Sequence, residues 1–394
     1  MDFRLTEEQE KRRGEFSQVC SDLENKKPVG YVSIESLFED ANWEYYQLCR
    51  KEFARRGWTT INWPAEYGGH GNMMDRVFLA EAMGYYHVPG FDMWGIQMLA
   101  PTLLAVASDE IKKRFLPPIA RAEVHWCEMW SEPNAGSDLA SLTSTAIRKG
   151  NEFVLNGQKI WTTGAHMSDW SFGVFKSDLE AKKHHNLTFL LVDMKTPGIT
   201  IRPINYMNGN HVYNEVFLDD VRVPAENIVG QEHGGWAVVN TLAAFERSFI
   251  ELVMMMQRML DDLVVYCNQT RRNGQLLSST PVIRNRIAQA ACELEAARML
   301  SYRIADLQGR NEMALIQPAA LKIFAGELVE RMSFMVTDDI LGPFGQVKTS
   351  RWAPLDGFWE DQCHECFALN IAAGTNEIQR NVIAWYGLGL PRMK

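Results

Sequence analysis

The sequence predicts an α+β protein with a helical domain over residues 1–125, an antiparallel, β-barrel-like domain over 126–232 and a four-helix bundle over 233–394. Three observations support this class. A chain of 394 residues is too long for one small core. Apolar residues recur at helical spacing in the first and last parts, and they alternate with polar residues in the middle part.

The first part is predicted to begin with a helix that has Thr6 as its N-cap and acidic residues in its first turn. Apolar residues three and four positions apart predict four further helical segments: Leu37–Phe53, Val77–Tyr86, Met98–Val106 and Asp109–Phe115. The pair Pro117-Pro118 is expected to end the last of them.

The middle part is predicted to consist of short strands separated by Gly, Pro and Asn. Clear strand runs are Phe172–Phe175, Thr188–Asp193 and Glu215–Leu218. A polar turn is expected at Lys149-Gly150, and the following alternating run continues through Ile160-Trp161-Thr162. Within that run Asn156-Gly157 is the dipeptide typical of a tight turn.

The last part is predicted to form long amphipathic helices, which together indicate a bundle. The segments are Trp236–Thr270, Pro281–Gln308, Gln317–Leu341, Gln362–Ala373 and Glu377–Tyr386.

Composition limits the possible functions. The formal net charge is −9 and no long basic run occurs, which argues against nucleic acid and anionic membrane surfaces as partners. The sequence contains no stretch of 18 apolar residues, so no membrane-spanning helix is predicted. Its first residues do not resemble a signal peptide. Seven scattered cysteines fit a reducing cytoplasm, and Cys363 and Cys366 are interpreted as thiols inside a helix. No metal site is predicted.

Three places are candidates for chemistry. The turn-rich loop that contains Ser131 and Ser137 would expose hydroxyls and N–H groups, as a flat ligand with phosphates requires, although an ordinary hairpin explains it equally well. Glu246 lies in an apolar stretch, where Arg247 has a helical partner in Glu251 and Glu246 has none nearby. A desolvated glutamate has a raised pKa, which suits a general base.

Asp92 is the third candidate. It is interpreted either as a helix N-cap after Pro89-Gly90 or as a polar group in a substrate pocket. Aromatic and Met residues, Trp94 among them, cluster around it in the sequence.

Four stretches carry a resemblance to a known family. They are S-E-P-N-A-G-S-D followed by N-G-Q-K-I-W-T-T (131–138 and 156–163), W-P-A-E-Y-G-G-H-G (63–71), L-D-D-V-R-V-P (218–224) and A-G-T-N-E-I-Q-R (373–380). In this order they closely resemble the acyl-CoA dehydrogenase family, nearly from end to end. The resemblance implies FAD as cofactor and conversion of an acyl-CoA thioester to a 2-enoyl-CoA.

The resemblance also implies site residues. The expected FAD contacts are Trp130, Ser131, Ser137, Trp161, Thr163, Thr375 and Glu377, and, for the FAD of a neighbouring subunit, Asp339, Gly342, Pro343 and either Arg271 or Arg272. The expected substrate contacts are Ser137, Asp92, Trp94, Arg247, Ala373 and Gly374.

The sequence departs from the family pattern in three places. Ala373 stands where most members carry the catalytic base, and Glu246 stands where isovaleryl-CoA and long-chain members carry it, so Glu246 is the expected base. The usual R-x-x-F-G is altered to T-R-R-N-G-Q at 270–275, and Ala244 replaces an Asp of the pantetheine-binding stretch.

The resemblance further implies an electron-transfer flavoprotein or similar acceptor, a role in β-oxidation or related lipid metabolism, and a homodimer or homotetramer. A bulky, branched or cyclic acyl group is expected. Two alternatives stay open: a degenerate partner subunit of a hetero-oligomer, and an oxygen-using oxidase or monooxygenase of the same fold.

Overall fold

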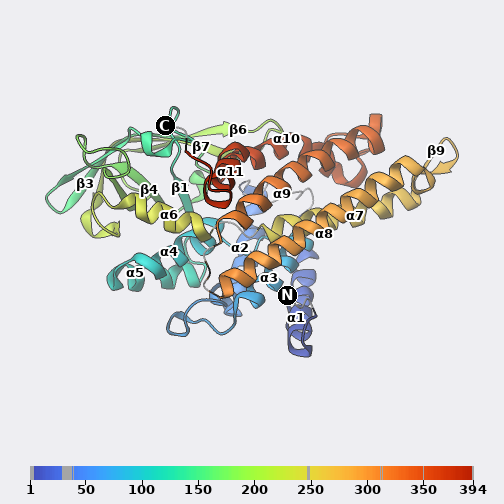
Figure 1. The fold of residues 1–394 in the computed structure, drawn as a ribbon, viewed down its shortest axis with the longest axis horizontal. Helices are drawn as coiled ribbons and strands as arrows, with labels where there is room; N and C mark the ends of the chain where they lie inside the picture. The colour runs from blue at the N-terminus through green and yellow to red at the C-terminus, as the bar shows by residue number, and fades with distance from the viewer. Residues whose placement is uncertain are drawn as a thin grey trace. The chain divides into compact units, whose positions relative to one another are not determined.

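The computed structural model describes residues 4–28, 38, 40–245, 249–310, 312, 314–348 and 350–392, without the side chains of residues 40, 41, 244 and 245. The chain divides into two compact units. Unit 1 comprises Met1–Ile34, Gly71–Pro89 and Arg247–Lys394, and unit 2 comprises Glu35–His70 and Gly90–Glu246. Helices, then strands, then helices follow one another along the chain (Figure 1), which confirms the predicted α+β class. The boundaries of the three predicted domains stay predictions.

Unit 2 is built around an eight-stranded sheet. Its strands are β1 (Trp126–Met129), β2 (Thr145–Lys149), β3 (Glu152–Lys159), β4 (Trp170–Lys176), β5 (Leu187–Asp193), β6 (Ile199–Asn205), β7 (His211–Pro224) and β8 (Ile228–Val229). The order is β6-β7-β3-β2-β4-β5-β8, and β1 pairs with β4. The ladders are antiparallel except for β1–β4 and the single β2–β4 pair, so the prediction of an antiparallel domain holds for most of the sheet.

Helices accompany this sheet in the same unit. They are α2 (Asp40–Arg55), the π-helix η4 (Met93–Leu99), α4 (Ala100–Val106), α5 (Asp109–Ala120) and α6 (Gly235–Phe245). The alternating strand pattern supplies the core, in which Phe153, Leu155 and Phe175 are fully buried. Each such side chain contributes about 1.5–3 kcal/mol through burial.

The predicted tight turn at Asn156-Gly157 is wrong. Strand β3 runs through both residues, and its register with β7 shifts between Leu155 and Gly157, which makes a β-bulge. A Cβ on Gly157 would lie 2.2 Å from Ser144 Oγ, and the φ of Gly157 is 147°. The chain turns instead at Gly150, between β2 and β3, as the polar Lys149-Gly150 pair predicted. Strand β3 ends at Lys159, so Ile160-Trp161-Thr162 lies beyond the predicted strand.

The expected break at Pro117-Pro118 is also wrong, because α5 continues through both prolines to Ala120. The prolines lack N–H groups and cannot bond to the preceding helical turn. That turn carries the exposed Lys113 and Arg114, so its carbonyls lie on the solvent side and the lost bonds cost little.

Unit 1 contains the predicted helical bundle. Its long helices are α7 (Ile250–Gln269), α8 (Pro281–Gly309), α9 (Ile316–Phe334) and α10 (Phe358–Ile371), with α7 to α9 lying alongside one another (Figure 1). Their apolar stripes meet in a core that includes Leu263, Leu294 and Trp359. Further elements are α1 (Glu7–Glu24), α3 (Met73–Tyr85), η9 (Met335–Leu341), α11 (Asn376–Val382), η12 (Ile383–Gly387), β9 (Arg271–Arg272) and β10 (Gln275–Leu276).

The N-terminal helix α1 begins as predicted. Thr6 accepts a hydrogen bond from the N–H of Gln9, and the Gln9 side chain accepts one from the N–H of Thr6. Helix α1 packs on α3 within unit 1. The buried Glu81 of α3 pairs with Arg13 of α1 and Arg298 of α8, which ties the three helices together.

The single helix predicted over Trp236–Thr270 is not continuous in the described residues. Helix α6 ends at Phe245 and α7 starts at Ile250, after Phe249 with a φ of 47°. A helical residue requires a negative φ, so Phe249 interrupts the helix despite its uniform apolar pattern.

None of the helices in the described part of the chain combines the length and apolar composition needed to cross a bilayer.

Candidate active site

The loop between β1 and β2 carries the first group of predicted site residues. Glu132 and Ala135 exchange two backbone hydrogen bonds of 3.0 Å, which closes a tight turn around Pro133 and Asn134. Ser131 is half-buried and Ser137 is exposed. The indole Nε1 of Trp130 is buried and has no hydrogen-bond partner among the described residues. The loop therefore offers hydroxyls at its surface and one unsatisfied donor.

The second group follows β3. Trp161 has a φ of 61° and 54% of its surface exposed, although it is a large aromatic residue. Its neighbour Thr162 is buried and is held by Asn214, whose carbonyl and side-chain amide exchange hydrogen bonds of 3.0 Å with the Thr162 backbone. Thr163 is half-buried. The exposed indole of Trp161 is thus carried by a left-handed backbone that the hydrogen bonds of Thr162 hold in place.

One backbone hydrogen bond joins these two groups of predicted site residues. The N–H of Ile160 donates to the carbonyl of Ser131 over 2.9 Å. The structure therefore brings Trp130, Ser131 and the Trp161–Thr163 segment together, although about 30 residues separate them along the chain.

Sequence reasoning missed the ion pair between these groups. Lys159 is fully buried, and its Nζ lies 3.0 Å from Oε1 of Glu132. Burial alone would raise the pKa of Glu132, but the Lys159 ammonium and the hydrogen bonds from Thr143 and Ser144 outweigh it and hold that pKa at about 2. Both residues stood within the quoted motifs, but the polar residues Ser131 and Gln158 precede them, so the local pattern did not mark either charge as buried.

A histidine pair linked to Thr162 through Asn214 was also missed. The rings of His166 and His211 stack with centroids 3.8 Å apart. The Asn214 side chain contacts both rings, with its Nδ2 3.1 Å from Nδ1 of His166 and its Oδ1 2.8 Å from Nε2 of His211. Their spacing along the chain gives no periodic signal, so only the fold reveals the pair.

Asp92 is buried, with 1% of its surface exposed. It stands at the N-cap position of η4, but its carboxylate accepts the N–H of Trp126 in β1 over 3.0 Å. Burial raises the pKa of Asp92 to about 6, against the opposing effect of the Arg50 guanidinium. Trp94, in the first turn of η4, is half-buried. Asp92 therefore bridges a helix and a strand, and its role toward a substrate stays a prediction.

In unit 1, the predicted residues near the C-terminus form a tight turn before α11. Ala373 has a φ of 55° and Gly374 a φ of 77°. The buried Gln379 side chain donates to the Ala373 carbonyl over 2.8 Å and stabilises this left-handed pair. Thr375 caps α11 by accepting the N–H of Ile378, and Glu377 is exposed. The turn carries no carboxylate at position 373.

The structure also brings together two segments of unit 1 that were predicted to contact a neighbour's cofactor. Arg272 of the β9–β10 hairpin donates to the carbonyls of Ile340 and Leu341 over 2.8 and 3.1 Å. Its guanidinium lies over the ring of Phe344, next to Gly342 and Pro343. Arg271 donates to the carbonyl of Gly274 within its own hairpin. Both candidate arginines therefore already contact their own chain.

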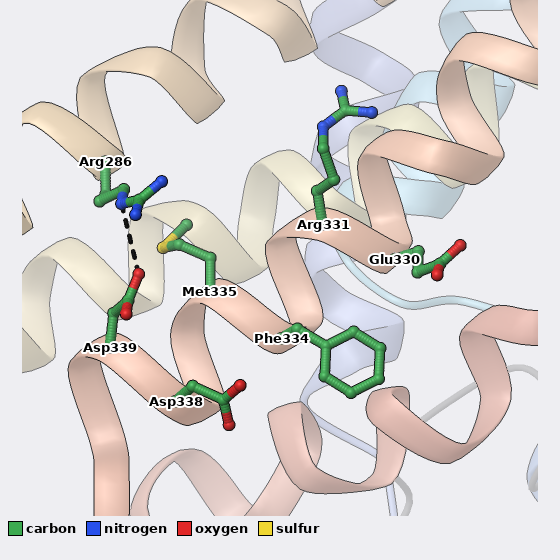
Figure 2. A pocket seen from close by; sticks show the side chains of 7 residues that line it. All are labelled: Arg286, Glu330, Arg331, Phe334, Met335, Asp338 and Asp339. Carbon is green, nitrogen blue, oxygen red and sulfur yellow. Dashed lines mark ion pairs between the residues drawn. The ribbon is translucent and has the colours of Figure 1, made fainter.

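Asp339 lies at the edge of a surface pocket of about 380 Å³. Figure 2 shows the Asp339 carboxylate pointing toward the Arg286 guanidinium, with Asp338 beside it. The ion pair spans 3.3 Å. The remaining lining residues are Glu330, Arg331, Phe334 and Met335. The pocket is open and of mixed charge, and it borders the Ile340–Pro343 segment.

The expected base, Glu246, and its neighbour Arg247 lie outside the described residues. From the sequence, Arg247 is expected to have a helical partner in Glu251. Glu251, in the first turn of α7, raises the pKa of the buried Arg76 of α3, opposing the larger lowering caused by burial. Glu251 therefore has a cationic neighbour in α3.

Three family models match consecutive parts of the chain. They are the N-terminal domain of acyl-CoA dehydrogenase over residues 33–123, the middle domain over 127–221 and the C-terminal domain over 233–386. The chain belongs to the acyl-CoA dehydrogenase family. The family predicted from the four motifs is thereby confirmed, and the chain is an oxidoreductase of this family.

Individual proteins agree with this assignment. The chain is 34% identical over 362 residues to acyl-CoA dehydrogenase IpdE1 of Mycobacterium tuberculosis, covering 90% of each chain. Among solved structures it is similar to the Tcur3481-Tcur3483 steroid ACAD, with a TM-score of 0.89 at 28% identity and complete coverage of both chains. It is likewise similar to the ChsE4-ChsE5 complex from Mycobacterium tuberculosis, with a TM-score of 0.87 at 28% identity over all of both chains.

Acyl-CoA dehydrogenases are FAD flavoproteins, and the residues of unit 2 fit this cofactor. The unsatisfied Trp130 Nε1 and the buried Thr162 Oγ1, which also has no hydrogen-bond partner among the described residues, can bond to polar atoms of a ligand. The exposed Trp161 ring offers a flat apolar face to a ring system. Trp130, Ser131, Ser137, Trp161 and Thr163 are the residues of this unit predicted to hold FAD, and their individual contacts with it stay predictions.

Proposed function

We propose that this chain catalyses the α,β-dehydrogenation of an acyl-CoA thioester whose acyl group is bulky, branched or cyclic, with Glu246 as the base. Ala373 carries the proposal, because it provides no proton acceptor at the position where most family members have one. Glu246 is the carboxylate that the sequence offers instead.

The proposed reaction assigns a task to each residue. Glu246 takes the α-proton, the β-carbon loses a hydride, and a double bond forms between the two carbons. Bound FAD would supply the acceptor for this hydride. The N–H groups of the Ala373–Gly374 turn stabilise the negative charge that develops on the thioester oxygen. The left-handed turn held by Gln379 supports this role, since it fixes the direction of those N–H groups before substrate arrives. An electron-transfer flavoprotein or similar protein is the proposed electron acceptor.

Substitution of Glu246 by Gln tests the base. We expect FAD binding and folding to persist while kcat falls about a thousandfold, as is typical for loss of a general base. Adding Ala373→Glu to this variant should restore part of the activity, because it returns a carboxylate to the position used by most members. Near-normal turnover of the Glu246→Gln variant, measured as anaerobic flavin bleaching, would show that another group is the base.

The acyl group is inferred from the relatives. One similar structure is a steroid ACAD by name, and steroids are bulky and cyclic. Steady-state kinetics on butyryl-, octanoyl-, isobutyryl- and cyclohexanecarboxyl-CoA test the inference. We expect the branched and cyclic thioesters to have the higher kcat/KM. A tenfold preference for the straight chains, equivalent to about 1.4 kcal/mol, would contradict it.

A second candidate function is that of one subunit type in a hetero-oligomer. The ChsE4-ChsE5 complex contains two different proteins by name. Here the altered 270–275 motif and the bonds of Arg271 and Arg272 to their own chain favour a neighbour of another type. Purification of the chain alone distinguishes the two functions. A yellow protein that bleaches with substrate is a complete enzyme, and a colourless one that becomes active only with a second chain is a partner subunit.

A further inference from the structure

We propose that the buried ion pair of Lys159 and Glu132 positions the loop of residues 130–144 for FAD and thereby determines FAD affinity. This inference rests on the proposed function, because it assigns the pair a role toward the same cofactor. Neither residue is expected to touch the cofactor, so both are positioning residues.

Lys159 uses all three of its donors in the interior. Its Nζ donates to the carbonyl of Trp130 over 3.1 Å, to Oε1 of Glu132 over 3.0 Å and to the carbonyl of Val174 in β4 over 3.0 Å. An ammonium group has three N–H bonds, so none remains unsatisfied. Lys159 therefore fastens the start of the 130–144 loop to the centre of the sheet.

Glu132 fastens the other end of the same loop. Its Oε2 accepts the N–H and the hydroxyl of Thr143 over 2.6 and 2.8 Å, and its Oε1 accepts the N–H of Ser144 over 2.9 Å. Glu132 is 5% exposed. The carboxylate thus receives hydrogen bonds from the loop end and from Lys159 at once, and the pair closes the loop into a ring.

The position of the pair links it to both cofactor segments. Ser131 lies next to Glu132, and Trp161 lies two residues after Lys159. The bond from the Ile160 N–H to the Ser131 carbonyl connects the segments directly beside the pair. Movement of the pair would displace both segments together. A pair that holds the loop rigid therefore reduces the conformational entropy that the loop loses when a ligand binds.

The cost of the pair argues for such a role. Two buried charges lose their hydration, and apolar residues of similar volume often stabilise a fold equally well or better. An ion pair does what apolar side chains cannot: its directional bonds hold the backbone groups of Trp130, Thr143, Ser144 and Val174 in one arrangement. The pair therefore specifies the geometry of the loop in addition to filling the core.

Two substitutions separate positioning from general stability. Lys159→Met keeps the length of the side chain and removes the ammonium. Glu132→Gln is the milder change, since it keeps the shape and one acceptor oxygen. The matched control is Asn227→Ala, which removes a buried side chain of the same unit that contacts Leu191 and Arg114 and lies outside the loop.

The first measurement needs no cofactor. Hydrogen–deuterium exchange of the apoprotein should show peptides of the 130–144 loop exchanging at least about tenfold faster in both pair variants than in the wild type. In the control those peptides should exchange as in the wild type. Equal loop exchange in the wild type, the pair variants and the control would overturn the proposal.

The second measurement uses FAD. We expect the dissociation constant to rise at least about tenfold in the pair variants and to stay within about threefold in the control, with a changed visible circular dichroism of the flavin that remains bound. Unchanged affinity and spectrum in the pair variants would also overturn the proposal. A wild-type protein that fails to bind FAD would contradict the proposed function, and the exchange experiment would still decide the role of the pair.

Discussion

Asp92 shows how one buried carboxylate fits into an apolar interior. Its carboxylate accepts the N–H of Trp126, 34 residues away in sequence, yet burial leaves its charge poorly solvated. His125 lies 3.6 Å from its Oδ1, and Arg50 is the cation whose field acts on it. Because the folded pKa of about 6 exceeds the ordinary value of 3.8, the ionised form of Asp92 costs stability.

The Asp92→Asn substitution tests this upward shift of the Asp92 pKa. The amide that it introduces stays neutral at every pH, and its oxygen can still accept the Trp126 N–H. The wild type keeps its full stability below the unfolded pKa and loses it as pH rises through about 6. We therefore expect the variant to melt higher than the wild type at about pH 8, with a gain on the order of 2 kcal/mol, and to lose this advantage near pH 4. Thermal melts across this range measure it. A variant that is less stable at the higher pH would contradict the assigned pKa direction.

At the scale of elements, the bulge in β3 decides the direction of the strand toward the site. Gly157 lies where β3 approaches the backbone of Ser144, so one extra residue shifts the register with β7. Only glycine fits there, because a Cβ would lie 2.7 Å from the Cα of Ser144 and the φ is 147°. Only Gln158 separates the bulge from Lys159.

Substitution of Gly157 by Ala tests the bulge. The added methyl must displace the Ser144 backbone, so we expect a loss of about 2 kcal/mol or more and a fall in Tm of at least about 2 °C. Gly136→Ala is the control, because a Cβ there meets nothing within 4 Å. If both variants have the same Tm as the wild type, the bulge is not a constrained feature.

At the scale of the whole molecule, unit 1 contains a segment suited to meeting another chain. Arg272 holds the carbonyls of Ile340 and Leu341, while Phe344 is 55% exposed beneath its guanidinium. The family resemblance assigns this segment to the FAD of a neighbouring subunit. Assembly and flavin retention should therefore depend on the same residues.

We expect Arg272→Ala to release flavin and to dissociate at about tenfold higher protein concentration than the wild type. The control is Arg271→Ala, since the Arg271 guanidinium donates to the Gly274 carbonyl inside its own hairpin. Light scattering combined with flavin absorbance over a dilution series measures both effects. A monomer that keeps all of its flavin would contradict the dependence.

The sequence by itself determined the fold class, the family and the cofactor. Helical spacing and strand alternation are local patterns, and the motifs at 131–138, 156–163 and 373–380 are contiguous, so each can be recognised without knowing what it touches. The same local patterns failed where a long-range contact overrode them. Asn156-Gly157 has the composition of a turn, but pairing with two neighbouring strands and the approach of Ser144 make it a bulge.

Only the tertiary structure decided which charges meet. Lys159 and Glu132 are 27 residues apart, and Arg272 lies 68 residues from Ile340, so no spacing rule links either pair. The partner of a buried charge is set by sheet register and helix packing, because these place atoms within about 3 Å across distant segments. Periodicity reports which face of an element is buried, and it carries no information on which opposing side chain that face will meet.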